Sequence, residues 1–156
     1  MNIVIIGSGG REHALCYKLL KSSKINKIYC IPGNAGTDEI ATNIFADIND
    51  FDEIYKIVLK LNVELIVVGP EIPLVNGIVD YFEKKNIKIF GPNKKCSQLE
   101  GSKFFMKNIC KKYNIPSAKY FEISDINQIE KFLSGVSFPV VVKSDGLAAG
   151  KGVTIC

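Results

Sequence analysis

Glycines and lysines near the end of the chain are spaced as in loops that bind phosphate. Gly146, Gly150 and Gly152 stand close together, and Lys143 precedes them at the end of an apolar, β-branched stretch. Glycines let the backbone approach an anion with its N–H groups pointing inward, and lysines add positive charge. The spacing is not that of a Walker loop, since three residues separate Gly146 from Gly150 and Gly152 replaces the required Ser or Thr. We expect a nucleotide triphosphate here, with an ordinary glycine-rich turn as the alternative.

A second glycine cluster opens the chain at residues 7–10, directly after another apolar, β-branched run. If this run is a strand and a helix follows, the glycines lie at a helix N-terminus, where free N–H groups and the helix dipole favour phosphate. Next come Arg11 and His13, the single arginine and the single histidine of the chain. Because lysine serves nearly everywhere else, the lone arginine indicates a two-pronged contact with phosphate or carboxylate. The alternative is an ordinary residue at the start of a helix.

These first glycines fit a dinucleotide-binding fingerprint only in part. Gly7 and Gly9 match the pattern G-x-G-x-x-G, but Glu12 takes the place of the third glycine, so close helix–strand packing is expected to be lost. The second expected strand ends at Ile31-Pro32 and not at an acidic residue that could hold a ribose hydroxyl. Both features disfavour an NAD-linked enzyme.

Apolar runs that end in glycine or proline alternate with helical patterns along the first hundred residues. We expect strands at residues 2–6, 27–31, 44–46, 64–68 and 87–90, with a continuous helix over 73–86. Repeated β-α-β units predict an α/β fold with a doubly wound parallel sheet. Ligands of such sheets bind beyond the carboxyl ends of the strands, where the loops GSGGREH, PGNAGT, GPEIP and GPN stand here.

The pattern changes near Gly101, where we place a boundary between a first domain, 1–101, and a second, 102–156. In the second part we expect a helix over 102–113, a strand near 119–121 and a helix from Ser124 or Asp125 to Leu133. The stretch 138–143 is expected to be a strand buried on both faces, because it is apolar and β-branched throughout.

Composition argues against several classes of protein. The net charge of +4 comes from 20 basic and 16 acidic residues spread along the chain, so no nucleic-acid partner is expected. Five cysteines without a C-x-x-C pair suggest neither a disulfide framework nor a zinc site. No apolar run approaches the roughly 20 residues that span a bilayer, so we expect no membrane partner and a cytoplasmic location.

Six motifs, in this order and at these spacings, closely resemble glycinamide ribonucleotide synthetases: GSGGREHAL, PGNAGT, GPEIPLVNG, IFGPN, QLEGSK and VVKSDGLAAGKGV. This family joins glycine to 5-phosphoribosylamine at the expense of ATP in purine biosynthesis, through a glycyl phosphate. The resemblance implies a Rossmann-like domain that precedes an ATP-grasp domain, of which the chain holds only the beginning. It also implies that the chain alone is an inactive N-terminal fragment. A free-standing phosphoribosyl- or nucleotide-binding module is the alternative. A biotin-dependent carboxylase shares the opening but gives no reason for PGNAGT and GLAAGKG together.

The resemblance also assigns site residues. Those expected at ATP are Lys103, Lys143, Ser144, Asp145, Gly146, Gly150, Lys151 and Gly152. Those expected at phosphoribosylamine are Gly7, Gly9, Gly10, Arg11, Glu12, His13, Gly33, Asn34, Gly69 and Glu71. Arg11 and Gly9 would contact the phosphate and Glu71 the ribose. The resemblance implies Mg²⁺ or Mn²⁺ as cofactor, with ligands beyond Cys156, so neither a metal ligand nor a catalytic residue is assigned within the chain.

Overall fold

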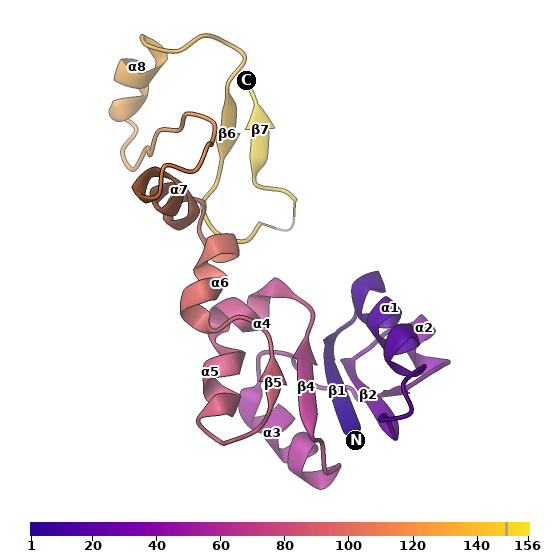
Figure 1. The fold of residues 1–156 in the computed structure, drawn as a ribbon. Coiled ribbons are helices and arrows are strands. Elements are labelled where there is room, and N and C mark those ends of the chain that lie inside the picture. Colours follow the sequence, from indigo (N-terminus) through magenta and orange to yellow (C-terminus); the bar gives the residue numbers. More distant parts are fainter. Residues whose placement is uncertain (149) are drawn as a thin grey trace. The chain divides into compact units, whose positions relative to one another are not determined.

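A computed structural model describes residues 1–148 and 150–156, which form two compact units, Met1–Ser97 and Gln98–Cys156. The first unit is built on a parallel five-stranded sheet with the strand order β3-β2-β1-β4-β5 (Figure 1). Its strands are β1 Asn2–Gly7, β2 Lys27–Pro32, β3 Thr42–Asn43, β4 Leu65–Val68 and β5 Ile89–Phe90. The order reverses between β1 and β4, and in open α/β sheets ligands bind at this switch point. The predicted doubly wound parallel sheet is confirmed.

Helices cover both faces of this sheet. They are α1 Gly10–Leu19, α2 Ala35–Asp38, α3 Phe51–Lys60, α4 Glu71–Asn76 and α5 Ile78–Glu83, and α6 Lys94–Gly101 follows β5. The alternating side chains of β1 explain the two layers. Val4 and Ile6 belong to the core that α3 and α5 close, whereas Ile3 and Ile5 pack in the core that includes Cys16 of α1. All four β1 side chains are almost fully buried, as a central parallel strand requires.

Some predicted elements differ from those observed. The expected helix over 73–86 breaks into α4 and α5 because Gly77 adopts the left-handed conformation, with φ of 97°. The Gly77 N–H donates to the carbonyl oxygens of Pro73 and Leu74, which ends α4 as a C-cap does. The third strand occupies Thr42–Asn43 and not residues 44–46, and β5 is limited to Ile89–Phe90. Both are edge strands, whose extent depends on pairing with a single neighbour.

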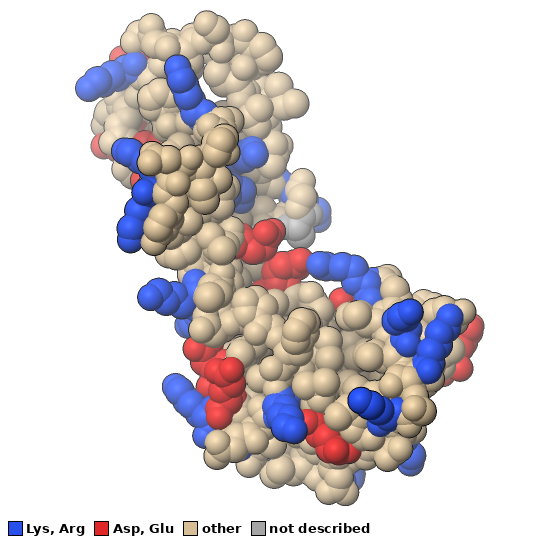
Figure 2. All heavy atoms as spheres, in the orientation of Figure 1, with Lys and Arg blue, Asp and Glu red and all other residues tan. Residues whose placement is uncertain are grey.

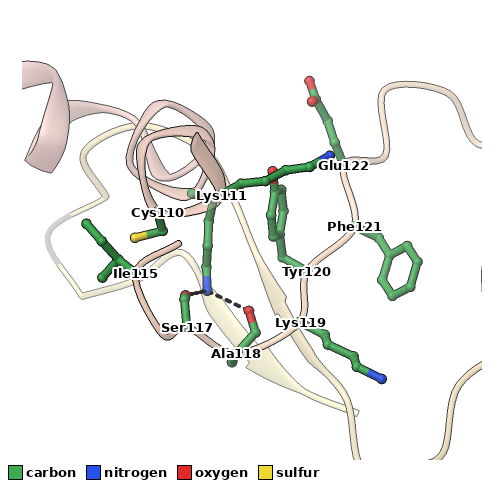
Figure 3. A pocket seen from close by; sticks show the side chains of 10 residues that line it. Cys110, Lys111, Ile115, Ser117, Ala118, Lys119, Tyr120, Phe121 and Glu122 are labelled. Carbon is green, nitrogen blue, oxygen red and sulfur yellow. Dashed lines mark hydrogen bonds between the residues drawn. The ribbon is translucent and has the colours of Figure 1, made fainter. Parts of the chain in front are cut away.

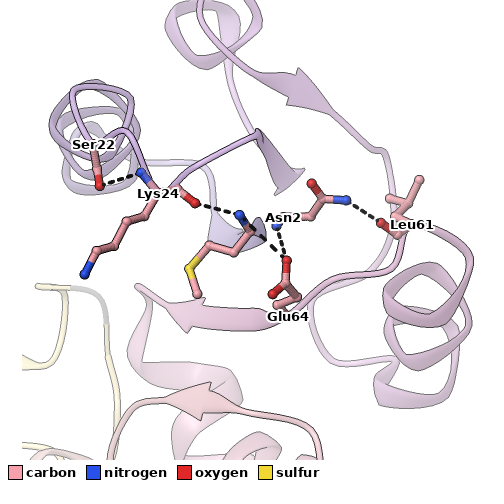
Figure 4. Close-up of polar contacts among 6 residues, drawn as sticks. Asn2, Ser22, Lys24, Leu61 and Glu64 are labelled. Atoms are coloured by element: carbon pink, nitrogen blue, oxygen red, sulfur yellow. Dashed lines mark hydrogen bonds and ion pairs between the residues drawn. The ribbon is translucent and has the colours of Figure 1, made fainter.

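The amino edge of the sheet, away from the predicted ligand site, is tied by polar contacts (Figure 4). The Asn2 backbone N–H donates to Glu64 Oε1 at 3.1 Å, and Asn2 Nδ2 donates to the Leu61 carbonyl at 2.9 Å. These bonds join β1 to the turn that precedes β4. The contacts therefore fix the register of the two strands that flank the switch point.

The second unit contains α7 Lys103–Lys112, α8 Gln128–Leu133 and an antiparallel pair, β6 Val141–Lys143 with β7 Val153–Ile155. The expected strand near 119–121 is wrong, since these residues are in no regular element. The helix expected from Ser124 or Asp125 begins only at Gln128, because the Asp125 carboxylate accepts hydrogen bonds from Asn127 in a preceding turn.

The predicted burial of residues 138–143 is also wrong. The strand begins at Val141, and Val141 and Val142 are 54% and 56% exposed. The reason is that β6 pairs with β7 in a two-stranded sheet and lacks a covering layer, and none of the described residues from 98 to 156 is buried. Among the helices of residues 1–148 and 150–156, none is both long and apolar enough to cross a membrane.

Candidate functional site

The loop between β1 and α1 lies at the carboxyl edge of the first sheet. Gly7 has a φ of 128°, a backbone conformation that L side chains rarely adopt, so glycine is required there. Gly9 is extended and is the N-cap of α1, and its N–H donates to Glu12 Oε2 at 2.6 Å. Gly10 begins the helix and is exposed, with open space where a side chain would extend. The predicted loop at a helix N-terminus is therefore present.

Arg11 and Glu71 meet above the ends of β1 and β4. Arg11 Nη2 donates to Glu71 Oε1 at 2.8 Å, although the two residues are 60 positions apart in the chain. Their side chains are 70% and 40% exposed, so a ligand can reach both. The hydrogen bond from Arg11 lowers the pKa of the Glu71 carboxyl below its ordinary value. The structure thus brings together the two residues that the sequence assigned to phosphate and ribose.

The loop after β2 is bonded to the loop after β1. Asn34 caps α2 through Thr37 N, and its Nδ2 donates to the carbonyl oxygens of Ser8 and Gly9 at 2.9 and 3.2 Å. His13 packs beside this loop: a Cβ added at Gly36 would lie 2.6 Å from His13 Nδ1. Asn34 therefore supports the first glycine loop from the side of β2, and His13 of α1 packs against Gly36.

Sequence reasoning missed two polar residues beneath this second loop. Thr37 is fully buried; its Oγ1 accepts from the Asn34 N–H at 2.7 Å and donates to Asn43 Oδ1 at 2.7 Å. Asn43 also donates to the Asn34 carbonyl, and a Cβ at Gly33 would come within 2.1 Å of Asn43 Oδ1. The N-x-x-T spacing of a capping box could have revealed Thr37. Asn43 has no local signal, because it lies on an edge strand.

In the second unit, Asp145 binds the N-terminus of α7. Its carboxylate accepts hydrogen bonds from Ser102 Oγ at 3.0 Å and from Lys103 N at 2.6 Å. Burial alone would raise the pKa of Asp145, but these hydrogen bonds, with those from the Phe104 and Gly146 backbone, lower it below its ordinary value. Lys103 Nζ donates to the Gly146 carbonyl at 2.8 Å. The predicted nucleotide residues Lys103, Asp145 and Gly146 are therefore in contact.

The glycine-rich loop connects β6 to β7. Gly146 and Gly150 have φ of 85° and 79°, and both positions are open where a Cβ would lie. Gly152 is crowded instead: its Cβ would lie 2.2 Å from Ser144 Oγ. Lys143 and Lys151 are exposed at the two ends of the loop. Residue 149, inside the predicted loop, lies outside the described residues.

A cavity of about 560 Å³ also lies in the second unit, apart from the predicted nucleotide residues (Figure 3). It is bounded by Lys107, Cys110 and Lys111 of α7, by Ile115 and by residues 117–122. Lys107 Nζ donates hydrogen bonds to Ser117 Oγ and to the Ala118 carbonyl, so the ammonium group already has partners within the protein.

Figure 2 shows basic and acidic side chains interspersed on the face that it displays. Within residues 1–148 and 150–156, no cluster of three or more His, Cys, Asp or Glu is placed to hold a metal ion.

Comparison with known proteins also divides the chain into two parts, at a point close to the division between the two structural units. The family model described as phosphoribosylglycinamide synthetase, N domain, matches residues 1–100, and the model for the ATP-grasp domain matches residues 101–156. The chain belongs to the phosphoribosylglycinamide synthetase family. This confirms the family to which the six sequence motifs pointed.

Individual synthetase relatives agree. The chain is 44% identical over 155 residues to phosphoribosylamine–glycine ligase of Caldanaerobacter subterraneus and 46% identical over 156 residues to that of Clostridium acetobutylicum. These matches cover 99% and 100% of this chain, but only 37% and 38% of the relatives. A crystal structure of phosphoribosylamine–glycine ligase from Thermotoga maritima aligns with a TM-score of 0.75 at 33% identity, over 99% of this chain and 36% of that one.

The synthetase fold extends beyond this family. The biotin carboxylase domain of 2-oxoglutarate carboxylase from Hydrogenobacter thermophilus aligns with a TM-score of 0.77, over 99% of this chain and 37% of that one. Its identity of 20% shows a shared fold alone. The fold is therefore shared with a protein of a different name, and the family assignment depends on sequence.

Proposed function

We propose that this member of the synthetase family takes part in the ATP-dependent joining of glycine to 5-phosphoribosylamine, which gives glycinamide ribonucleotide. In this proposal the carboxyl edge of the first sheet binds the phosphoribosyl group. The observation that carries it is the Arg11–Glu71 pair at 2.8 Å, directly at the β1/β4 switch point of a chain of this family. The relatives named phosphoribosylamine–glycine ligase support the choice of reaction.

The phosphate is assigned to the N-terminus of α1. Arg11 presents a planar guanidinium that can donate two parallel hydrogen bonds to phosphate oxygens. Gly10 adds an exposed backbone at the positive end of the helix dipole. The sequence also pointed to Gly9, but its N–H already donates to Glu12, so we assign the phosphate to Gly10 and Arg11.

The ribose is assigned to Glu71, whose carboxylate can accept hydrogen bonds from sugar hydroxyls. In the structure this carboxylate accepts from Arg11. An exposed ion pair contributes only about 0–1 kcal/mol to stability, so breaking the Arg11–Glu71 pair when Arg11 binds a phosphate costs little free energy. Asn34 holds the first loop in place while the ligand binds.

The nucleotide is assigned to the second unit. Lys103 and Lys143 would contact ATP phosphates, and the loop 144–152 would cover them, with Gly146 and Gly150 leaving the backbone open to the ligand. Bound ATP supplies the phosphoryl group that activates the glycine carboxylate. Among the described residues, no three His, Cys, Asp or Glu side chains lie close enough together to hold a magnesium ion.

We also propose a domain boundary at residue 101 and a cytoplasmic location. The observed units meet between Ser97 and Gln98, and the two family models meet between residues 100 and 101. A free-standing binding module is the alternative: it would bind the same ligands, and ADP release that depends on ATP and glycine would exclude it.

Calorimetry on the 156-residue chain tests the proposed phosphoribosyl site. Glycinamide ribonucleotide should bind, and the matching riboside without its 5-phosphate should bind at least roughly tenfold more weakly, because the charged contact to Arg11 is lost. Equal affinities for the two compounds would contradict the assignment of the phosphate to Arg11.

A further inference from the structure

Glu12 is a buried carboxylate at the carboxyl edge of the first sheet. Its residue is only 3% exposed, and Oε2 accepts the Gly9 N–H at 2.6 Å. The other oxygen, Oε1, is also buried and has no hydrogen-bond partner among the described residues. Leaving a buried carboxylate oxygen unpaired costs free energy, so such a residue calls for an explanation beyond packing.

Three glycines from two loops enclose the Glu12 side chain. A Cβ at Gly69 would lie 2.0 Å from Glu12 Oε1, one at Gly7 would lie 2.7 Å from Glu12 Cδ, and one at Gly9 would lie 2.9 Å from Oε2. Gly7 ends β1 and Gly9 belongs to the loop that follows it, whereas Gly69 follows β4. Glycine at Gly9 and Gly69 therefore makes room for Glu12.

The two loops that enclose Glu12 are also the loops that carry the proposed ligand contacts. Gly9 stands two residues before Arg11, and Gly69 stands two residues before Glu71. The Glu12 side chain lies against both loops, next to the backbone hydrogen bond by which the Gly69 N–H donates to the Ile6 carbonyl at 3.0 Å. Because the Glu12 residue is buried and Oε1 is closed off from solvent, we expect the carboxylate to act through the two loops and not through the direct contact with phosphoribosylamine that the resemblance implied.

We propose that Glu12 is a positioning residue, which sets the spacing of Arg11 and Glu71 for the phosphoribosyl group by holding the two loops around its carboxylate. This inference rests on the proposed function and deepens it. It predicts that Glu12 and Gly69 act as a unit: the methyl group of Gly69→Ala is harmful only while the Glu12 carboxylate is present. Gly69 is not in the positive-φ region, so alanine strains no backbone there.

A double-mutant cycle tests this coupling, with glycinamide ribonucleotide as the calorimetric probe. Glu12→Ala and Gly69→Ala should each weaken binding roughly tenfold, and the double variant should match Glu12→Ala within about twofold. Glu12→Gln keeps the length and an acceptor for Gly9, so it should retain most of the affinity. Gly135→Ala is the matched control, since its Cβ would meet nothing closer than 3.8 Å and lies in the second unit.

Two further measurements separate this inference from the proposed function. The same non-additivity should appear in the melting temperatures, and the Gly9 amide proton should move upfield in Glu12→Ala, because its carboxylate acceptor is lost. If the wild-type chain fails to bind the probe, the proposed function is wrong, and the melting temperatures still decide the coupling. If the fold-losses in affinity of the two single variants multiply in the double variant, or if their changes in melting temperature add, Glu12 is not a positioning residue.

Discussion

Replacing Arg11 with alanine should separate ligand binding from folding. The Arg11–Glu71 pair is exposed, with side chains 70% and 40% accessible, and such pairs contribute about 0–1 kcal/mol to stability. The free energy of unfolding should therefore fall by less than about 1 kcal/mol. A hydrogen-bonded contact between Arg11 and a phosphate is worth about 1.5–3 kcal/mol, which corresponds to an affinity loss of roughly 10- to 150-fold.

Calorimetry with glycinamide ribonucleotide measures the affinity, and urea unfolding followed by circular dichroism measures the stability of the same samples. Arg11→Lys should recover only part of the affinity, because lysine keeps the charge but loses the planar fork. Lys18→Ala is the matched control: it removes one positive charge from the exposed end of the same helix.

Unchanged affinity in Arg11→Ala would refute the reasoning and make Arg11 a structural residue at the start of α1. The phosphate site would then move to the loop around Gly33 and Gly36. An equal loss in Lys18→Ala would show instead that the ligand responds only to overall charge.

Three other predictions concern ionisation, the nucleotide and the domain boundary. Arg11→Ala should raise the pKa of Glu71 toward its ordinary value of 4.5, as measured by carbon-13 NMR. Because the pair lowers this pKa, the stabilisation that it gives is present at pH values above the ordinary pKa and is lost as the pH falls through the lowered pKa. An unshifted pKa in Arg11→Ala would contradict the observed pair. Lys103→Ala should weaken ATP binding measured by calorimetry, whereas Lys112→Ala on the same helix should not, and equal losses would mean that the nucleotide is misplaced. Limited proteolysis with mass spectrometry should cut first within residues 98–156, where no described residue is buried; first cuts inside 1–90 would place the boundary elsewhere.

The central sheet could be predicted because its strands carry their own signal. The apolar, β-branched runs at β1 and β4 are buried on both faces, and each ends in a glycine loop, so the continuous run and its end predict the strands that flank the site. Short edge strands carry little such signal, and for this reason the predicted third strand begins two residues after the observed β3. The break at Gly77 was missed because a helical pattern continues across it on both sides.

Burial and long-range contacts could not be predicted from local patterns. Residues 141–143 have the composition of a buried strand, but burial depends on which layer covers the strand. Glu12 departed from a dinucleotide fingerprint, and only the structure shows that Gly69, a glycine from a different loop, provides its space. The Arg11–Glu71 contact likewise depends on the pairing of β1 with β4.

The central claim is that the loops at the carboxyl edge of the first sheet bind the phosphoribosyl group. Nitrogen-15 NMR of the 156-residue chain, titrated with glycinamide ribonucleotide, tests it most directly because each backbone amide reports separately. We predict saturable shifts concentrated in residues 7–13, 33–37 and 69–71, with little change along α7. Shifts confined to residues 102–156, or no saturable shift at residues 7–13 and 69–71, would contradict the account.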